Sequence, residues 1–379
     1  MRISPGQTIG ILGGGQLGRM MALAAKEMGY RIAVLEPSLD SPAGQVADVE
    51  VKAAYDDQNG ALKLKEHCDI LTYEFENIDA NTASFLEKEL YLPQGSQLLY
   101  TTQHRLREKR AIERAGVSVA PYYGVESLED VKEGLKQLGC PAVLKTCQGG
   151  YDGKGQVVIH KEVDGKDAFR SLSETGASSF VLEAWIPFEK EISVIVTRST
   201  TGEVATFPVG ENIHVNNILH QTIVPARIPK EIEQKSEEMA IQIAKHLELV
   251  GTLAVEMFVL ENGDIYVNEL APRPHNSGHY TIEACETSQF AQHIRAIAGL
   301  PLGSTTLFKP VVMTNILGQH VQSVQQQYDR FIKVGHVHFY GKKEAKYGRK
   351  MGHWTVLAPT LKEAIERTEE VWADVNDSE

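Results

Sequence analysis

Residues 252–270, TLAVEMFVLENGDIYVNEL, give the strongest indication of the architecture of this chain. Two apolar runs rich in β-branched and aromatic residues flank Asn262-Gly263, which predicts a β-hairpin closed by a two-residue type I′ turn. Glu256 and Glu269 each lie six positions outside that turn, so the predicted register places them opposite each other. Like charges in opposed positions destabilise a sheet, and Glu256 interrupts an apolar strand. The pattern therefore predicts a functional site at this pair.

A divalent cation between the two carboxylates would remove their repulsion. Oxygen ligands favour Mg²⁺, which takes one or two carboxylates and completes its octahedron with water and nucleotide phosphates. We therefore expect Glu256 and Glu269 to hold Mg²⁺, with Mn²⁺ as the alternative ion. The competing interpretation is that one glutamate pairs with a lysine or faces solvent.

The segment that follows, LAPRPHNSGH at 270–279, is rich in turn residues and polar groups. Arg273 offers a planar fork for a small carboxylate or carbonate, and His275 and Asn276 can hydrogen-bond a trigonal oxyanion. A surface loop with incidental polar residues is the alternative. The position of this segment directly after the predicted metal site favours an oxyanion site.

A glycine-rich stretch, CQGGYDGKGQ at 147–156, lies between the predicted strands PAVLK and VVIH. A phosphate-binding Walker loop runs from a strand into a helix and ends in GK[ST], so this stretch is a different device. Its many free backbone amides suit a flap that closes over phosphates and excludes water, and Lys145 would add a positive charge. The alternative is a hairpin tip without a role.

The N-terminal region reads as strand, glycine turn GGGQLG at 13–18, helix and strand, ending at Glu36. This spacing alone suggests NAD, with Glu36 on a ribose, although a tight packing turn is the alternative. Glycine amides at a helix N-terminus hold any phosphate or carboxylate, so the loop predicts an anionic ligand without identifying it.

The length of 379 residues and the hydrophobic content of 42% allow two or three domains. We expect a Rossmann-like domain at 1–115, a small lid domain at 116–187 and a C-terminal domain at 188–379. A charged helix at 105–115 marks the first boundary, and PFEK at 187–190 is a hinge-like second one. A capped helix in SLEDVKEGLKQLG and a long helix at about 229–247 are also predicted.

The net charge of -12 argues against nonspecific binding to nucleic acid or to an anionic membrane. The N-terminus lacks the apolar core of a signal peptide, and the four scattered cysteines fit a reducing compartment, so a cytoplasmic protein is expected. Near the C-terminus, five basic residues make the electrostatic potential locally positive: Lys342, Lys343, Lys346, Arg349 and Lys350. Either they bind a phosphate monoester on a small substrate, or they are a charged segment that faces solvent.

Together these features resemble the ATP-grasp superfamily, in which two α+β domains clamp ATP. Within it, GGGQLGRM, YEFENID, GGYDGKGQ, NELAPRPHNSGH and GRKMGH resemble N5-carboxyaminoimidazole ribonucleotide synthetases over nearly the whole chain. The resemblance implies an α/β and α+β fold with a pre-ATP-grasp domain, and a C–N-bond-forming ligase of purine biosynthesis. Such a ligase would carboxylate 5-aminoimidazole ribonucleotide with bicarbonate and ATP, through carboxyphosphate, as a homodimer.

The resemblance also implies roles for individual residues. The implied ATP contacts are Arg105, Lys145, Gly150, Tyr151, Asp152, Gly153, Lys154, Gly155, Gln156, Glu183, Ala184, Trp185, Ile186, Glu191, His214, Asn268 and Glu269. The implied ribotide contacts are Gly15, Gln16, Leu17, Glu74, Tyr151, Asp152, Lys343, Arg349 and Lys350. The implied catalytic set is Arg273, His275 and Asn276 for bicarbonate, with Asp152 and Lys343. Because YGKKEAKYGRK is one residue longer than the family pattern, Lys342 and Lys343 are alternatives for one role.

Other functions explain less of the sequence. A nicotinamide-dependent oxidoreductase accounts only for the first 36 residues, and a silent nucleotide-binding regulator leaves the opposed glutamates and the flap unused. Formate-using ribotide transformylases and biotin carboxylases share the clamp but lack the PRPHNSGH context.

Overall fold

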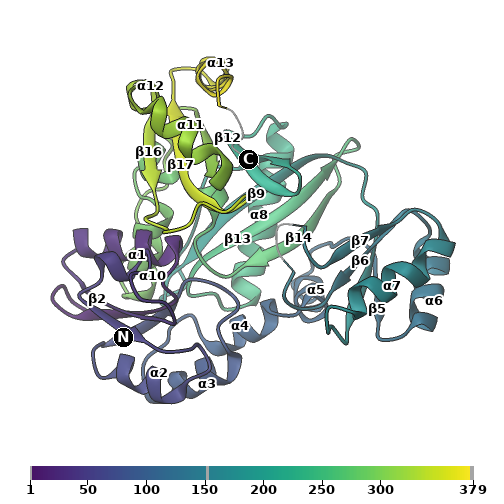
Figure 1. Ribbon diagram of the computed structural model, residues 1–379, viewed down its shortest axis with the longest axis horizontal. Helices are drawn as coiled ribbons and strands as arrows, with labels where there is room; N and C mark the ends of the chain where they lie inside the picture. The colour runs from purple at the N-terminus through teal and green to yellow at the C-terminus, as the bar shows by residue number, and fades with distance from the viewer. Residues whose placement is uncertain (1, 151–152, 376–379) are drawn as a thin grey trace.

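The computed structural model describes residues 2–150 and 153–375, which form three β-sheets covered by helices (Figure 1). The first sheet is parallel, in the order β3-β2-β1-β4, and consists of β1 (Thr8–Leu12), β2 (Arg31–Glu36), β3 (Val49–Lys52) and β4 (Ile70–Tyr73). Its helical segments are α1 (Gln16–Glu27), η1 (Gly44–Val46), α2 (Gln58–Lys65), α3 (Ala80–Glu89) and α4 (Ser96–Thr102). The predicted strand, turn, helix and strand at the N-terminus are confirmed.

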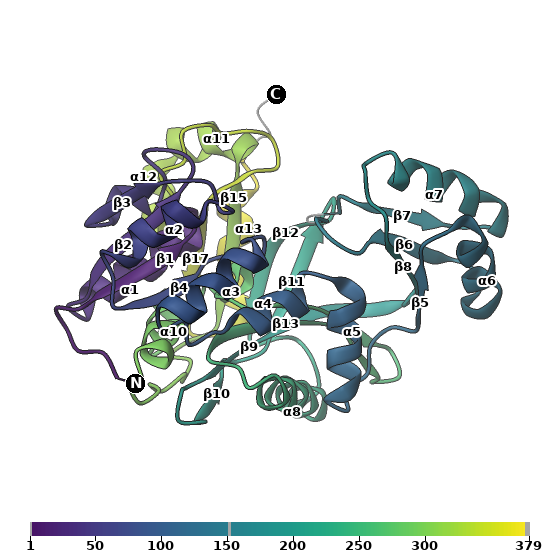
Figure 2. The same ribbon diagram turned by 90° about the horizontal axis from the view of Figure 1, so that it is seen from below.

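The second sheet belongs to a small lobe that stands apart from the rest of the molecule in Figures 1 and 2. It is antiparallel, in the order β5-β8-β6-β7, with β5 (Tyr122–Val125), β6 (Ala142–Thr146), β7 (Gln156–Ile159) and β8 (Phe180–Ala184). Its helical segments are α6 (Leu128–Leu138), η2 (Glu162–Asp164) and α7 (Gly165–Ser173), and α5 (Arg105–Arg114) leads into the lobe. α6 begins with a capping box between Ser127 and Asp130, as the sequence predicts.

The third sheet has nine strands, in the order β14-β13-β9-β11-β12-β15-β17-β16, with β10 beside β9. They are β9 (Phe188–Arg198), β10 (Val204–Thr206), β11 (Gly210–Val215), β12 (Ile218–Val224), β13 (Gly251–Leu260), β14 (Ile265–Ala271), β15 (Val311–Leu317), β16 (His336–Phe339) and β17 (Lys350–Leu357). The accompanying helices are α8 (Lys230–His246), η3 (Asn276–Gly278), α9 (Thr281–Ala284), α10 (Gln289–Ile297), η4 (Gly318–His320), α11 (Val321–Gln326), α12 (Tyr328–Val334) and α13 (Leu361–Trp372). Among the described residues, no helix is both long and apolar enough to cross a membrane.

The hinge expected at 187–190 is mostly strand, because β9 begins at Phe188. The Phe188 ring stacks on that of Phe258 with centroids 4.5 Å apart, and Lys190 pairs with Val259 across the sheet. Pairing with a strand some 70 positions later extends β9 to this point, which the local sequence could not indicate.

The hairpin of β13 and β14 has the predicted pairing of Glu256 with Glu269 but not the predicted turn. The backbone N–H of Leu260 donates to the Asp264 carbonyl, and the Leu260 carbonyl accepts from the N–H of Gly263, so the loop has three residues. Within this loop, only Gly263, with φ of +82°, has the left-handed backbone. The Asn262 side chain accepts from the backbone N–H of Asp264 at 3.0 Å, which stabilises this longer loop. The resulting one-residue shift is compensated by a bulge at Asn268, which restores the opposition of the glutamates.

Candidate active site

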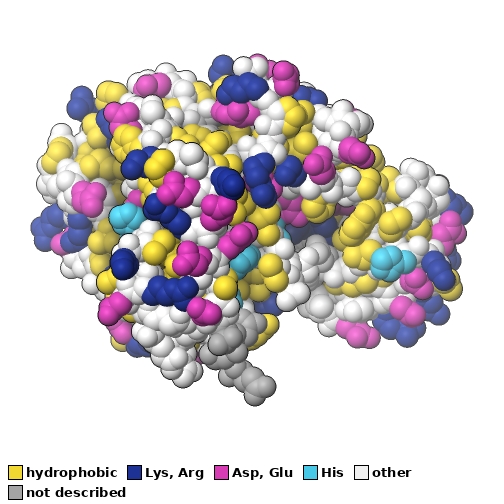
Figure 3. All heavy atoms as spheres, turned by 90° about the horizontal axis from the view of Figure 1, so that it is seen from above, with side chains coloured by type: hydrophobic (Ala, Val, Ile, Leu, Met, Phe, Trp, Pro, Cys, Tyr) yellow, Lys and Arg dark blue, Asp and Glu magenta, His cyan; other side chains and the backbone are white. Residues whose placement is uncertain are grey.

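A cavity of about 680 Å³ lies between the small lobe and the nine-stranded sheet. Figure 3 shows the surface hollowed between the lobe and the main body. All the predicted ATP contacts that the structure describes line this cavity except Gly155, and Tyr151 and Asp152 lie outside the described residues. The cavity is also lined by the following predicted residues: Glu256, Arg273, His275, Asn276 and Lys350. One site therefore brings together most of the predicted nucleotide, metal and bicarbonate groups.

On the lobe side, Glu183 of β8 forms ion pairs with two lysines. Its carboxylate lies 2.8 Å from Nζ of Lys145 and 3.0 Å from Nζ of Lys109. Burial opposes ionisation of Glu183, but Lys145 and Lys109 outweigh it and lower the pKa of Glu183 to about 2. This fixed charge network sets the position of Lys145 at the cavity. Sequence reasoning missed Lys109, whose only signal is its place in the charged helix α5.

The opposed carboxylates lie on the sheet side of the cavity. Burial, followed by the charge of Glu269, raises the pKa of Glu256 to about 8. Glu269 lies 3.3 Å from Nη1 of Arg105, and the bulge directs Asn268 and Glu269 into the same cavity. The Oδ1 atom of Asn268 is buried and has no hydrogen-bond partner among the residues that the structure describes. Two facing carboxylates and an unpaired amide oxygen suit a hard divalent cation, so these residues fit Mg²⁺.

Another carboxylate near this pair, Glu108 of α5, is buried and accepts a hydrogen bond from the backbone N–H of Leu270 at 2.8 Å. Burial, followed by the charge of Glu269, raises the pKa of Glu108 to about 8. Glu108 thereby fixes the backbone directly after Glu269. The sequence did not single it out, because no local pattern indicates which face of α5 meets β14.

Arg273 lines the cavity, but most of its fork is already engaged. Its Nε donates to Oε2 of Glu76 at 2.6 Å, and its Nη2 donates to Oε1 of Glu76 at 3.1 Å. Burial opposes ionisation of Glu76, yet Arg273 outweighs it and lowers the pKa of Glu76. The two-pronged contact that the sequence suggested for a carbonate is therefore made with Glu76. The part of the Arg273 guanidinium that is not bound to Glu76 is Nη1, which donates to the Pro274 carbonyl at 3.3 Å.

His275 is held as a neutral imidazole. Its Nδ1 accepts from the backbone N–H of Ser277 at 3.3 Å and lies 2.9 Å from the Ser277 hydroxyl, so the proton is on Nε2. Nε2 lies 3.3 Å from Oε1 of Glu256. Burial, followed by the charge of Arg273, lowers the pKa of His275 well below its usual value. His275 therefore orients the carboxylate of Glu256.

The N-terminal glycine loop is occupied by the protein's own carboxylates. Glu74 accepts hydrogen bonds from the backbone N–H of Gly15 and, at 2.6 Å, from that of Gly18, and Glu36 accepts from Gly14 at 2.9 Å. A Cβ at Gly13 would lie 2.4 Å from Cγ of Glu74, which explains the glycine there. The expectation of an external anion on these amides is therefore wrong for these three glycines. Within residues 2–150 and 153–375, no hydrogen bond uses the first-turn backbone N–H groups of Gln16 and Leu17, so these are the donors left at this helix start.

The basic segment divides into two parts. Lys350 lines the cavity, and the carbonyl of Lys350 accepts from Nζ of Lys342 at 2.7 Å. Lys343 instead lies 3.2 Å from Asp40 of the N-terminal domain, and Arg349 is exposed and donates to the Glu344 carbonyl at 3.1 Å. The structure thus separates Lys342, which supports the strand carrying Lys350, from Lys343, which faces the N-terminal domain.

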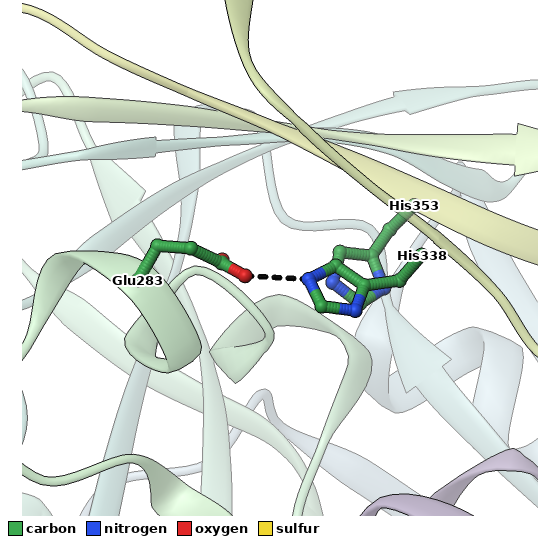
Figure 4. Close-up of side chains that lie close together, drawn as sticks. All are labelled: Glu283, His338 and His353. Carbon is green, nitrogen blue, oxygen red and sulfur yellow. Dashed lines mark hydrogen bonds and ion pairs between the residues drawn. The ribbon is translucent and has the colours of Figure 1, made fainter. Parts of the chain in front are cut away.

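A second polar cluster, Glu283, His338 and His353, was not predicted (Figure 4). Nε2 of His338 lies 2.5 Å from Oε1 of Glu283, and the His338 and His353 rings stack with centroids 4.5 Å apart and planes at 17°. Nearly parallel rings direct their in-plane lone pairs along separate planes, so one cation cannot lie in both. This arrangement is a hydrogen-bonded ring stack rather than a metal centre.

Comparison with known proteins identifies the class first. Residues 110–290 match the ATP-grasp domain, residues 6–103 the ribonucleotide synthetase preATP-grasp domain, and residues 311–367 the phosphoribosylaminoimidazole carboxylase C-terminal domain. With the clamp-like cavity described above, these matches define an ATP-grasp ligase.

Whole-chain relatives define the family. The chain is 54% identical over 370 residues to N5-carboxyaminoimidazole ribonucleotide synthase of Bacillus subtilis, covering 98% of this chain and 96% of the relative. It is 46% identical to that of Staphylococcus aureus, over 93% of both chains. An ADP complex of an N5-carboxyaminoimidazole ribonucleotide synthetase superposes with a TM-score of 0.95 at 58% identity, over 99% of both chains. An Aspergillus clavatus enzyme in complex with ADP and 5-aminoimidazole ribonucleotide superposes with a TM-score of 0.91 at 31% identity, over 97% of this chain and 98% of that one. The chain belongs to the N5-carboxyaminoimidazole ribonucleotide synthase family.

Proposed function

We propose that this ligase carboxylates 5-aminoimidazole ribonucleotide with bicarbonate and ATP, giving N5-carboxyaminoimidazole ribonucleotide, ADP and phosphate. The observation that supports this most strongly is the facing pair Glu256 and Glu269, directly beside the segment of Arg273, His275 and Asn276 in one cavity. A metal-binding pair next to oxyanion donors suits phosphoryl transfer to a small oxyanion.

ATP is proposed to lie between the lobe and the sheet. Lys145, fixed by Glu183, would neutralise phosphate charge, and Arg105, which lies beside Glu269, would do the same. The remaining proposed ATP contacts are the other residues of the ATP set given under the sequence analysis. The glycine-rich flap at 150–156 is proposed to close over the phosphates. Mg²⁺, held by Glu256 and Glu269, would neutralise charge on the phosphates during transfer, and Mn²⁺ is the alternative ion.

Bicarbonate requires activation because its carbon is a poor electrophile. One of its oxygens attacks the γ-phosphorus, ADP leaves, and carboxyphosphate forms. In one route, the exocyclic amine of the ribotide then attacks the carbon of carboxyphosphate and displaces phosphate. In the other, carboxyphosphate first divides into phosphate and carbon dioxide, and the amine attacks the carbon dioxide. In both routes the amine loses a proton as the carbamate forms. Arg273 Nη1 and the Asn276 amide are proposed to hold the bicarbonate, and Asp152, outside the described residues, to position the amine or accept its proton. Exclusion of water by the flap would protect carboxyphosphate from hydrolysis.

The ribotide is proposed to lie between the N-terminal domain and the basic segment. The backbone N–H groups of Gln16 and Leu17, together with Lys343, Arg349 and Lys350, would face its phosphate, beside Gly15, Glu74 and Tyr151. The ion pair of Lys343 with Asp40 supports this location, because it brings the basic segment against the N-terminal domain. The enzyme is further proposed to be cytoplasmic and to form a homodimer. Light scattering, which measures the molar mass in solution, would test the homodimer.

The deciding experiment follows ADP formation with and without the ribotide and bicarbonate. We expect ATP turnover to require both, and ¹³C-bicarbonate to appear in a carbamate of the ribotide. ATP turnover that is independent of the ribotide, or that requires formate or biotin instead of bicarbonate, would overturn the proposal.

A further inference from the structure

Gln289, the first residue of α10, clamps the active-site segment from behind. Its fully buried side chain accepts at Oε1 from the backbone N–H of His275, at 2.9 Å, and donates from Nε2 to the carbonyl of the same residue, at 2.7 Å. Because a backbone N–H only donates and a carbonyl only accepts, these two contacts fix which end of the Gln289 amide is nitrogen. A Cβ at Gly278 would lie 2.3 Å from Oε1, so the segment packs directly on this amide.

The same amide nitrogen determines the tautomer of His279. Nε2 of Gln289 lies 3.3 Å from Nδ1 of His279, and an amide nitrogen can only donate, so Nδ1 of His279 is the acceptor. Burial, followed by the charge of His338, lowers the pKa of His279 well below its usual value, so the ring is neutral. Its single proton is therefore on Nε2.

The proton on Nε2 of His279 in turn orients Asn276. Nε2 lies 3.2 Å from Oδ1 of Asn276 and donates to it. The Asn276 side chain lines the cavity, and none of the hydrogen bonds recorded for residues 2–150 and 153–375 uses its Nδ2. The amide therefore offers N–H donors to the cavity. The reversed amide would instead present a carbonyl oxygen, which repels an anion.

A column of rings holds His279 in place. The His279 ring packs on His353 with centroids 4.7 Å apart and on Phe290 at 5.7 Å. His353 stacks on His338, which Glu283 anchors (Figure 4). The column restricts rotation of the His279 ring. If the proton of His279 moved to Nδ1, the ring could therefore not turn over to compensate, and the side-chain amide of Asn276 would have to rotate instead.

We propose that Gln289 is a positioning residue that selects the Nε2–H tautomer of His279 and thereby presents the amide nitrogen of Asn276 to bicarbonate. This inference rests on the proposed function, since it takes Asn276 as a bicarbonate contact. It adds a determinant that lies outside the cavity and touches no substrate.

The test compares Gln289→Glu with two substitutions of His279. An ionised glutamate at 289 still accepts from the His275 N–H but donates neither to the His275 carbonyl nor to Nδ1 of His279. We expect the KM for bicarbonate to rise about tenfold, as for the loss of one hydrogen bond, while the KM for ATP stays within about twofold. His279→Gln keeps a donor near the position of Nε2 and should stay near the wild-type KM for bicarbonate, whereas His279→Leu should resemble Gln289→Glu.

A spectroscopic readout separates this role from a purely structural one. In ¹⁵N-histidine-labelled protein, the signal of His279 is identified as the one that disappears in His279→Gln. In the wild type this signal should show that Nδ1 of His279 carries no proton. In Gln289→Glu it should show that Nδ1 is protonated. A protonated Nδ1 in the wild type, or an unchanged bicarbonate KM in a folded Gln289→Glu, would overturn the inference. If wild-type ADP formation does not depend on bicarbonate, the proposed function is wrong. The tautomer measurement then still tests whether Gln289 selects the Nε2–H tautomer of His279.

Discussion

Replacing Glu269 by Gln should remove most ADP formation while leaving the fold nearly as stable as before. In the folded state at about pH 9, where Glu256 is ionised because its pKa is about 8, Glu269 is attracted by Arg105 at 3.3 Å and repelled by Glu256 on the neighbouring strand. At an effective dielectric constant of 20, the attraction is about 5 kcal/mol, and the repulsion at the roughly 5 Å typical of opposed side chains is about 3 kcal/mol. The Glu269 side chain is 41% exposed, so water screens both interactions. We therefore expect the free energy of unfolding to change by less than about 1 kcal/mol.

Catalysis loses one of the two carboxylates proposed to hold Mg²⁺, so the rate of ADP formation should fall about 100- to 1,000-fold. A coupled assay for ADP at millimolar Mg²⁺ measures the rate, and urea unfolding at about pH 9 without nucleotide measures stability under conditions in which Glu256 is ionised. Glu261→Gln is the matched control, because Glu261 is exposed in the loop of the same hairpin. A wild-type rate for Glu269→Gln would refute the metal assignment, and a loss of several kcal/mol in stability would refute the near-cancellation of the two charge interactions.

Three further predictions concern the flap, the basic segment and a buried histidine. Trypsin should cleave after Lys154 more slowly when ATP is present, because glycine-rich hairpin tips are ordered by ligand contacts, and equal rates would contradict a lid. Arg349→Ala should raise the KM for the ribotide about ten- to a hundredfold and leave that for ATP unchanged, with Lys346→Ala as the control; a rise in the ATP KM instead would return the segment to a solvated surface. Burial lowers the pKa of His293 to about 3, whereas in the unfolded chain the pKa of this histidine is about 6.5. Below about pH 6.5 the unfolded chain therefore binds a proton that the folded state excludes. The stability that His293 contributes is present above that pH and is lost as the pH falls toward 3. Between pH 7.5 and 5.5, wild type should lose about 1.4 kcal/mol more than His293→Gln in urea unfolding, and equal losses would contradict the buried neutral histidine.

The hairpin illustrates how a correct prediction can rest on an incomplete reason. The alternating pattern and Asn262-Gly263 predicted that Glu256 faces Glu269, and the structure confirms that pairing. The turn has three residues instead of two, and the bulge at Asn268 offsets the difference. The bulge follows from how β14 packs against its surroundings, since its backbone also meets Glu108 and Ser118 from the region between the first two sheets. Such contacts have no local sequence signal.

By itself the sequence determined the features that depend on neighbours within a few positions. The glycine turn after β1, the capping box of α6, the extent of α8 and the opposed glutamates all follow from turn chemistry, capping and periodicity, which act locally. The motifs then identified the family.

Only the tertiary structure decided which charges neutralise each other. Glu74 fills the amides of the glycine loop 59 positions earlier, and Glu76 engages Arg273 across 197 positions. Glu74, Arg273 and the glycine loop each look like ligand contacts in the sequence. The sequence pattern of a carboxylate, a basic residue or a glycine turn is the same whether its partner is a substrate or another part of the chain. Burial makes an unpaired charge costly, so the fold pairs them, and which pairs form depends on which segments the three sheets bring together.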